Sequence, residues 1–233
     1  SSLVTGVQTC ALPISYDTAP LLHSLNREGV SNEALYTNAT IALRPKTGEL
    51  AWFFQHMPND QWDLDWVFER QIVELGIGGN SRKVVLTAGK MALFDVLDAA
   101  TGEYLDSFDV GLQNIVTAID PQTGNKTINP RAIPNAEDSN LLCPMANAGR
   151  NWPSASINPT TKMLYLPLSE ICMMFGPTSD TRTLLSTGVS IVPQPTLNSD
   201  GKFGRVQAIN LETGEMVWDR SEEHTSELQS PVT

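Results

Sequence analysis

ALRPKTGELAW, from Ala42 to Trp52, is the stretch that decides the fold of this 233-residue chain. It starts with small and apolar residues, passes through a polar turn ending in Thr-Gly, and closes on apolar residues and Trp. This order is typical of a β-hairpin, because the turn supplies a residue that tolerates a positive φ and apolar strands flank it. We therefore predict two antiparallel strands joined at the Thr-Gly turn.

The same pattern recurs four more times along the chain. The further copies are VLDAATGEYLD, AIDPQTGNKTI, SINPTTKMLYL and AINLETGEMVW, which cover Val96–Asp106, Ala118–Ile128, Ser156–Leu166 and Ala208–Trp218. The first two copies start about 50 residues apart, as do the last two, and this is the length of a four-stranded propeller blade. Strong helical periodicity is missing, and the apolar runs are short and rich in β-formers. The sequence predicts an all-β fold, a partial β-propeller of roughly four stacked blades.

The two ends of the chain differ from this pattern. VTGVQTCALPI at Val4–Ile14 and RSEEHTSELQS at Arg220–Ser230 have neither a strand nor a helix period. A nucleotide string that encodes the second has a reverse complement that encodes most of the first, and it resembles a sequencing adapter. We therefore set aside residues 1–15 and 220–233 as probable adapter translation and expect the propeller segment in residues 16–219. Two unusual natural tails are the alternative.

Composition excludes several classes of function. The net charge of −11 argues against a nucleic-acid partner and against docking on an anionic membrane, since both need clustered Lys and Arg. No apolar stretch is long enough to span a bilayer. The chain has no Cys or His at zinc spacing, no glycine fingerprint for a nicotinamide cofactor and no nucleophile elbow.

The acidic segment PNDQWDLDWVFERQ, Pro58–Gln71, carries the strongest chemical signal. Asp63 and Asp65 are two residues apart, so in an extended strand both would point to one face. Carboxylates this close repel one another unless a cation or a shared proton lies between them, and a hard, oxygen-preferring metal would meet that need. The residues alone leave two possibilities open, a metal site or a solvated acidic loop.

Three further features are ambiguous by themselves. Lys90 precedes the strand MALFDVL and could be an ordinary surface lysine, and Asn151 in GRNWP could be a turn residue. Cys143 and Cys172 flank a hairpin-like stretch, and two free buried thiols are possible there.

These segments together resemble the pyrroloquinoline quinone (PQQ)-dependent alcohol dehydrogenases, over nearly all of residues 16–219. WDLDWVFERQ, GLQNIVTAIDPQTG and GRNWP carry the resemblance, and the Trp-ended repeats are similar to the tryptophan-docking motif of this family's eight-bladed propellers. By this likeness, and equally as core aromatics of any propeller, Trp52 and Trp218 are expected in the core.

The resemblance implies roles for the acidic segment and for Lys90. Asp63 would be the general base that takes the alcohol proton as hydride leaves for the quinone. Asp65 stands where lanthanide-dependent members carry an extra carboxylate, so Asp63 and Asp65 would hold a lanthanide, with calcium as the second choice. Lys90 would polarise the quinone carbonyl region.

The resemblance also assigns roles to Asn151 and to the cysteines. Asn151 would hydrogen-bond the cofactor. Cys143 and Cys172 would form a disulfide, which fits a periplasmic location.

The function expected from this resemblance is oxidation of an alcohol to an aldehyde, with electrons passed to a cytochrome c. The alternative is a non-catalytic propeller that serves as a scaffold or binding module. The family's metal-binding Glu is expected upstream of this segment, and no Asn stands at Asp17–Pro20, where another metal ligand would fall. We therefore expect the chain to be a fragment that binds no PQQ and is inactive by itself.

Overall fold

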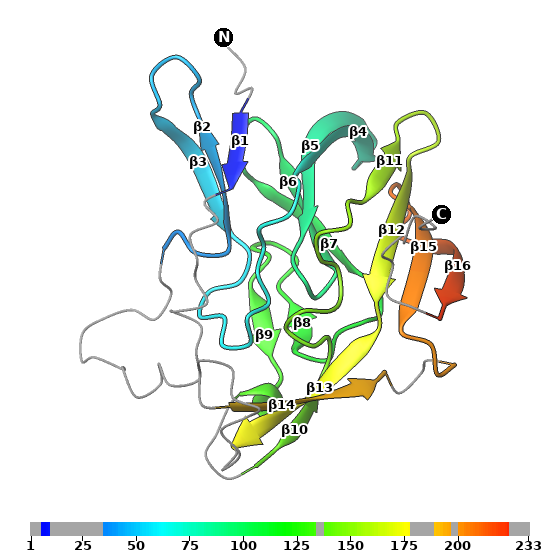
Figure 1. The fold of residues 1–233 in the computed structure, drawn as a ribbon. Helices are drawn as coiled ribbons and strands as arrows, with labels where there is room; N and C mark the ends of the chain where they lie inside the picture. The colour runs from blue at the N-terminus through cyan, green and yellow to red at the C-terminus, as the bar shows by residue number, and fades with distance from the viewer. Residues whose placement is uncertain (1–5, 10–34, 134–137, 178–188, 197–199, 224–233) are drawn as a thin grey trace, which may run out of the picture.

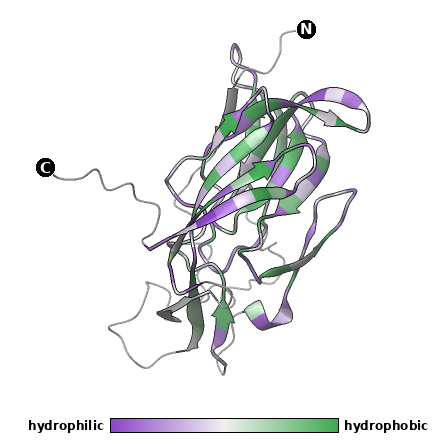
Figure 2. Cartoon of the chain, turned by 90° about the vertical axis from the view of Figure 1, so that its right-hand side faces the viewer, coloured by the Kyte–Doolittle hydropathy of each residue, from purple (hydrophilic) through white to green (hydrophobic). Residues whose placement is uncertain are grey.

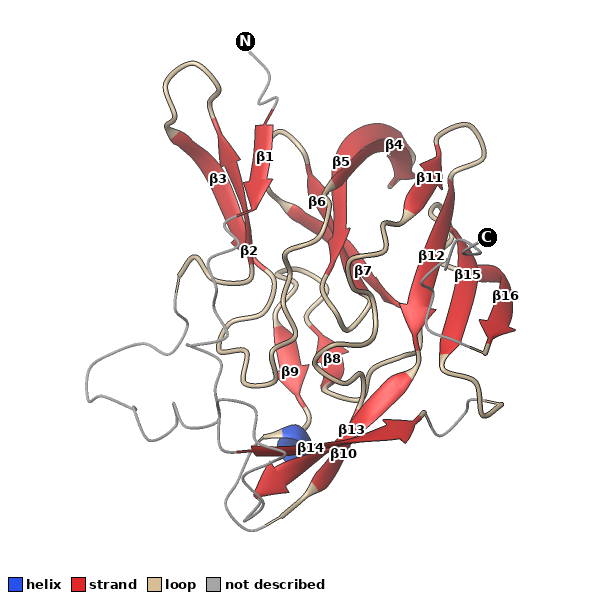
Figure 3. Cartoon of the chain, in the orientation of Figure 1, coloured by secondary structure: helices blue, strands red, loops and turns tan. Residues whose placement is uncertain are grey.

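The computed structural model describes residues 6–9, 35–133, 138–177, 189–196 and 200–223. Within these ranges the chain forms sixteen β-strands and one short 3₁₀ helix, η3 (Pro130–Ala132). Strands and their connecting loops make up nearly all of the described fold (Figure 3). The described part contains no helix that is long and apolar enough to cross a membrane.

The strands form antiparallel sheets, two of which have the four strands of a complete propeller blade. The first sheet has the order β1-β2-β3, with β1 (Gly6–Thr9), β2 (Ala39–Leu43) and β3 (Leu50–Gln55). The second, the central sheet, has the order β4-β5-β6-β7, with β4 (Gln71–Ile77), β5 (Asn80–Ala88), β6 (Leu93–Asp98) and β7 (Tyr104–Asp109). The third has the order β11-β12-β15-β16, with β11 (Ser156–Asn158), β12 (Met163–Ser169), β15 (Gly204–Asn210) and β16 (Met216–Glu222).

Two smaller sheets complete the described fold and lie in the lower half of Figure 1. One pairs β8 (Val116–Ile119) with β9 (Lys126–Ile128). The other has the order β10-β13-β14, with β10 (Asn140–Leu142), β13 (Ile171–Pro177) and β14 (Val189–Pro195). The expectation of an all-β, partial propeller is confirmed.

All five predicted hairpins are present, as β2–β3, β6–β7, β8–β9, β11–β12 and β15–β16. Each turn contains one residue with a positive φ at the expected position. These residues are Gly48 (74°), Gly102 (75°), Gly124 (73°), Lys162 (56°) and Gly214 (71°). The repeat therefore encodes a backbone requirement that glycine meets without steric cost.

The central sheet is covered on both faces. One cluster packs Val85 and Leu97 of this sheet against Ala42 and Trp52 of the first sheet. A second cluster joins the opposite face to Leu164, Leu166, Leu168 and Ile209 of the third sheet. Burial on both sides explains why the second half of β5, Val84–Ala88, and the first five residues of β6 are all buried, whereas hydrophobic and hydrophilic bands alternate along other strands (Figure 2).

The two repeat tryptophans have different environments. Trp52 is buried, and its ring lies so close to Gly102 that a Cβ there would come within 2.6 Å of it. Trp218 is 45% exposed and contacts the ring of Tyr165, so the prediction that it lies in the core is wrong. Trp52 is covered by the glycine turn of the following repeat, and the described residues supply no such turn for Trp218.

Two strands reach into the ranges that the sequence set aside. Gly6–Thr9 pairs with Thr40–Leu43, and Arg220–Glu222 pairs with Gly204–Val206 at the end of the third sheet. Main-chain pairing at a sheet edge requires an extended segment and no particular side chains. The rest of both ranges, residues 1–5, 10–15 and 224–233, lies outside the described residues, as do residues 17–20.

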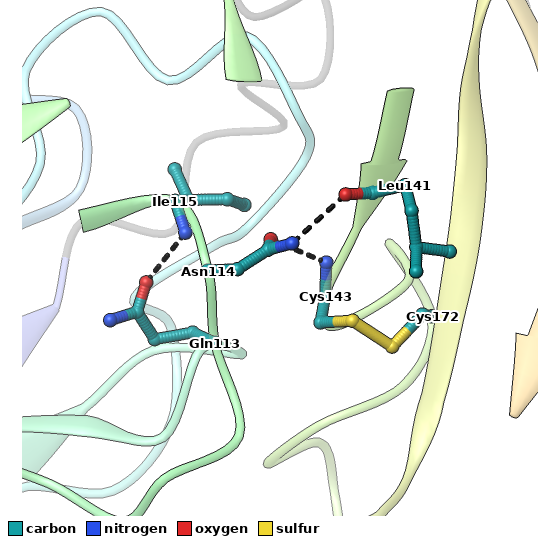
Figure 4. Close-up of a disulfide and its surroundings, with 6 residues drawn as sticks. All are labelled: Gln113, Asn114, Ile115, Leu141, Cys143 and Cys172. Carbon is teal, nitrogen blue, oxygen red and sulfur yellow. Dashed lines mark hydrogen bonds between the residues drawn. A yellow bond between two sulfur atoms is a disulfide. The ribbon is translucent and has the colours of Figure 1, made fainter. Parts of the chain in front are cut away.

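A disulfide joins Cys143 to Cys172, the pairing that the resemblance implied (Figure 4). The two cysteines are 29 residues apart, and closing a loop of this length stabilises the fold by about 3.6 kcal/mol in the chain-entropy description. The side chain of Asn114 hydrogen-bonds the main chain at the end of β10. It accepts from Cys143 N at 2.9 Å and donates to Leu141 O at 2.9 Å.

Candidate functional site

The acidic segment forms an irregular loop between β3 and β4, and Asp63 in it has a left-handed backbone with φ of 61°. The premise of an extended strand is therefore wrong, yet the two carboxylates do share one side. Asp60 accepts hydrogen bonds from Trp62 N at 3.0 Å and from Leu64 N at 2.8 Å. These two bonds turn alternate amides of the loop inward.

Asn38 completes the inner support of the loop. Its amide donates to Asp60 Oδ2 at 3.0 Å and accepts from Trp66 N at 3.0 Å. The side chains of Trp62, Leu64 and Trp66 are buried in the hydrophobic cluster beneath the loop. The even-numbered residues thus anchor the loop from inside, which leaves the two intervening aspartates to face the other way.

Lys90 lies on that outer side, where it contacts both Asp63 and Asp65. Its Nζ is 2.8 Å from Asp65 Oδ2 and 3.5 Å from Asp63 Oδ2, and it donates to Asp63 O at 2.7 Å. Its main-chain N donates to Asp65 O at 3.1 Å. Only 9% of the Lys90 side chain is exposed, so the surface-lysine alternative is wrong.

The surroundings of Asp63 favour its protonated form. Burial raises the pKa of Asp63 to about 6, with the charges of Asp65 and Asp60 acting in the same direction and Lys90 acting against them. Burial also raises the pKa of Asp60. A carboxyl group with a pKa near neutrality is suited to exchange protons with a substrate.

The GRNWP loop reaches the site through its main chain. Arg150 N donates to Lys90 O at 3.0 Å, while the Arg150 guanidinium donates to Ala88 O at 2.8 Å and contacts Glu69 at 2.5 Å. Asn151 instead bonds within its own loop, donating to Asn147 O at 3.0 Å and accepting from Trp152 N at 2.9 Å. In the part of the chain that is described, no hydrogen bond or ion pair joins the Asn151 side chain to Lys90 or to the two aspartates.

The donor chemistry of the loop fits part of a metal shell. Asp63 and Asp65 supply hard oxygen ligands that converge on one cationic group, as calcium-type ions require. Two carboxylates provide fewer than the roughly six to eight oxygens that such an ion takes. Among the described residues, no three His, Cys, Asp or Glu side chains are grouped to hold a metal.

A buried polar cluster, His56, Asp95 and Lys126, lies next to this loop. Asp95 Oδ2 accepts a hydrogen bond from His56 Nδ1 at 2.7 Å and forms an ion pair with Lys126 Nζ at 2.9 Å. Although burial acts to raise it, the pKa of Asp95 is held low by Lys126 and by hydrogen bonds from His56 and Ser107. His56 follows the end of β3, Asp95 lies within β6 and Lys126 begins β9, so the cluster connects three different sheets.

The tautomer of His56 follows from its partners. The ionised Asp95 carboxylate can only accept, so His56 Nδ1 carries the proton in their 2.7 Å hydrogen bond. In the neutral imidazole Nε2 is then an acceptor, and Thr40 Oγ1, which accepts from Arg70 Nε at 3.1 Å, donates to it at 2.7 Å. Burial lowers the pKa of His56 to about 4, against the opposing effect of Asp95 and with Arg70 and Lys126 adding to the lowering.

This shift predicts a pH-dependent contribution to stability. Between pH 6.5 and 4 the unfolded chain protonates His56 and the folded chain does not, so the folded state loses stability as pH falls. The loss is about 3 kcal/mol by pH 4 and is absent at pH 7. Urea unfolding of wild type and His56→Gln should show their free-energy difference shrinking by this amount from pH 7 to pH 4.

Comparison with the variant isolates this one titration. The raised pKa of Asp63 changes stability in the opposite direction over a similar range, and it cancels because both proteins carry it. A free-energy difference that stays constant from pH 7 to pH 4 would show that His56 is protonated equally in both states.

Sequence analysis did not predict that Asn38 and Asp60 support the acidic loop, or that His56, Asp95 and Lys126 form a buried cluster beside it. Asp60 carried a local signal, since an Asp two residues before a buried Trp can accept main-chain amides. Asn38 and the buried cluster carried none, because their contacts join residues 16 to 39 positions apart.

The comparisons with known proteins agree with this architecture. Residues 19–111, which include the acidic loop and Lys90, match the family model described as glucose/ethanol/alcohol dehydrogenase, beta-propeller domain (PQQ). The dehydrogenase subunit of a quinone alcohol dehydrogenase from Komagataeibacter europaeus is 30% identical over 158 residues, covering 67% of this chain and 21% of that protein. A 1-butanol dehydrogenase (cytochrome c) from Thauera butanivorans is 32% identical over 150 residues, covering 62% and 21%.

A solved structure shows the same fold. A europium-containing methanol dehydrogenase superposes with a TM-score of 0.75 at 21% identity, covering 87% of this chain and 35% of that chain. The chain spans about a fifth of the length of the curated relatives it matches, 21% in both cases above.

Four-stranded antiparallel sheets stacked face to face define this protein as part of a β-propeller. Residues 19–111 match the model of the PQQ β-propeller domain, and the similar curated proteins include the dehydrogenase subunit of a quinone alcohol dehydrogenase.

Proposed function

We propose that this chain carries part of the active site of a PQQ-dependent alcohol dehydrogenase that oxidises an alcohol to an aldehyde. The observation that carries this proposal is the convergence of Asp63 and Asp65 on the buried ammonium group of Lys90. A propeller that served only as a scaffold would have no need for this charged set, since a buried ion pair carries a desolvation cost that apolar side chains of similar volume avoid. The names of the similar proteins support the same reaction class.

Asp63 is the general base in this proposal. Its raised pKa, about 6, lets it accept the hydroxyl proton of the alcohol and release it again near neutral pH. PQQ, when bound, would supply the two-electron oxidant for the alcohol. Asp63 would take the hydroxyl proton, so that the oxidised substrate would leave as the neutral aldehyde.

Lys90 has two functions in this arrangement. Its Nζ holds the carboxylates of Asp63 and Asp65 in place, and its positive charge stabilises negative charge that develops on a neighbouring oxygen. Asn151 would offer its amide to the cofactor after exchanging its present bond to Asn147 O.

Asp63 and Asp65 would hold the metal ion, a lanthanide in preference to calcium. Two adjacent anionic ligands favour the more highly charged ion, and the europium-containing neighbour supports this preference. A cytochrome c acceptor is proposed from the name of the 1-butanol dehydrogenase relative. The Cys143–Cys172 disulfide supports an oxidising compartment such as the periplasm.

Substitution of Asp63 tests this function in the full-length enzyme that carries this segment, loaded with PQQ and a lanthanide. Asp63→Asn should lower kcat by about 10³-fold, because the substrate proton loses its acceptor. Bound PQQ, measured by absorbance, should stay constant. Asp106→Asn, at an exposed position of β7, is the matched control and should keep full activity.

Full turnover in Asp63→Asn and in Asp65→Ala, with the cofactor still bound, would overturn these roles. The non-catalytic scaffold would then be the better description of the chain.

A further inference from the structure

The Trp66 indole is the contact between the buried cluster and the candidate site. The His56 imidazole stacks on it, with ring centroids 5.0 Å apart and planes at 4°, and Lys126 Nζ lies 5.4 Å from the ring centroid. A Cβ at Gly89 would come within 2.6 Å of the indole, so the ring also lies directly against the chain that leads into Lys90.

Trp66 also adjoins Asp65, the other half of the ion pair. Asp65 O accepts from Lys90 N at 3.1 Å, and a Cβ at Gly89 would come within 2.7 Å of the same oxygen. The position of the indole therefore sets how closely the Asp65 and Gly89–Lys90 segments approach one another.

Hydrogen bonding does not fix the indole. Trp66 Nε1 is buried and has no partner among the described residues, so the stacking imidazole, the ammonium group and the surrounding packing hold the ring. Apolar residues of similar volume would fill the space of the cluster without the desolvation cost of a buried ion pair. A charged set in this place thus points to a requirement for geometry.

We propose that His56, Asp95 and Lys126 are positioning residues for the Asp63–Asp65–Lys90 site: they orient the Trp66 ring, which fixes Asp65 against Lys90. Asp95 acts as the hub, since it holds both His56 and Lys126 by hydrogen bonds. The importance of this geometry for catalysis rests on the proposed function, whereas the geometry itself is measurable in the chain without cofactor.

Hydrogen exchange tests this role through the Lys90 amide, which donates to Asp65 O. In His56→Leu, which cannot bond Asp95, the Lys90 amide should exchange about tenfold faster relative to the amides of β12, a strand of the third sheet. His56→Gln keeps a donor for Asp95 and should restore part of the protection. Lys126→Met should reproduce the effect of His56→Leu.

Arg205→Met is the matched control. It removes another partly buried ion pair, Arg205 with Glu170 at 3.1 Å, in which Arg205 lies on β15 of the third sheet. Because Arg205 pairs with Leu168, the reference here is the far end of β12, Met163–Leu166, and the ratio of Lys90 exchange to exchange at these amides should stay within about twofold of wild type.

Proportional acceleration of the Lys90 and β12 amides in every cluster variant would overturn the proposal, because it would indicate global destabilisation alone. If His56→Leu does not fold, the same ratio in His56→Gln and Lys126→Met decides. Failure here leaves the Asp63→Asn experiment unaffected, and loss of the proposed function would leave the exchange ratio unchanged, so the two ideas fail separately.

Discussion

Gly149→Ala is expected to lower the unfolding free energy by about 3–5 kcal/mol, the sum of left-handed backbone strain and steric overlap. Gly149 has a φ of 68°, and a Cβ there would overlap the main-chain O of Lys90 and come within 2.8 Å of Pro144 Cγ. A main-chain oxygen cannot move aside as the end of a flexible side chain can. The GRNWP loop must therefore separate from Lys90, which breaks the hydrogen bond from Arg150 N.

Gly111→Ala separates the two causes. Gly111 has a φ of 80°, and a Cβ there would meet nothing within 4 Å. This control carries only the backbone strain and should cost about 1–2 kcal/mol. Urea unfolding of both variants measures the difference, and equal losses would mean that the close approach to Lys90 contributes nothing.

Asp60→Ala is expected to have an effect of similar size, a loss of about 3–6 kcal/mol from three buried donors left without an acceptor. The donors are Trp62 N, Leu64 N and the Asn38 amide. The loop should then detach from its inner support and lose the arrangement that turns both aspartates toward Lys90. Thermal unfolding reports the stability, and exchange of the Trp62 and Leu64 amides reports the loop.

Asp120→Ala is the control for Asp60→Ala, since Asp120 accepts from Gln122 N and Thr123 N in the same local pattern. Asp120 is exposed, so water replaces the lost acceptor and the stability should change far less. A loss in Asp120→Ala as large as that in Asp60→Ala would show that burial is not the reason for the effect.

The hairpins were predictable because their signal is local. A Thr-Gly turn between apolar strands predicts both the position of the turn and the residue with a positive φ. Positive φ values are found at Gly48, Gly102, Gly124 and Gly214. The convergence of Asp63, Asp65 and Lys90 was expected from family resemblance, and spacing alone gave a wrong local picture, since Asp63 lies in an irregular loop. The amide of Asn151 bonds within its own loop here, and its role toward the cofactor stays a prediction.

The sequence by itself determined the all-β class, the hairpins and the acidic segment, because these features depend on residues a few positions apart. Only the tertiary structure decided that Trp52 is covered while Trp218 is half-exposed, since neighbouring repeats supply that cover. It also decided that Asn38 and Asp60 support the loop and that His56, Asp95 and Lys126 meet against Trp66. These contacts join residues that are distant in the chain. Burial strengthens each hydrogen bond and ion pair because water no longer competes for the polar groups.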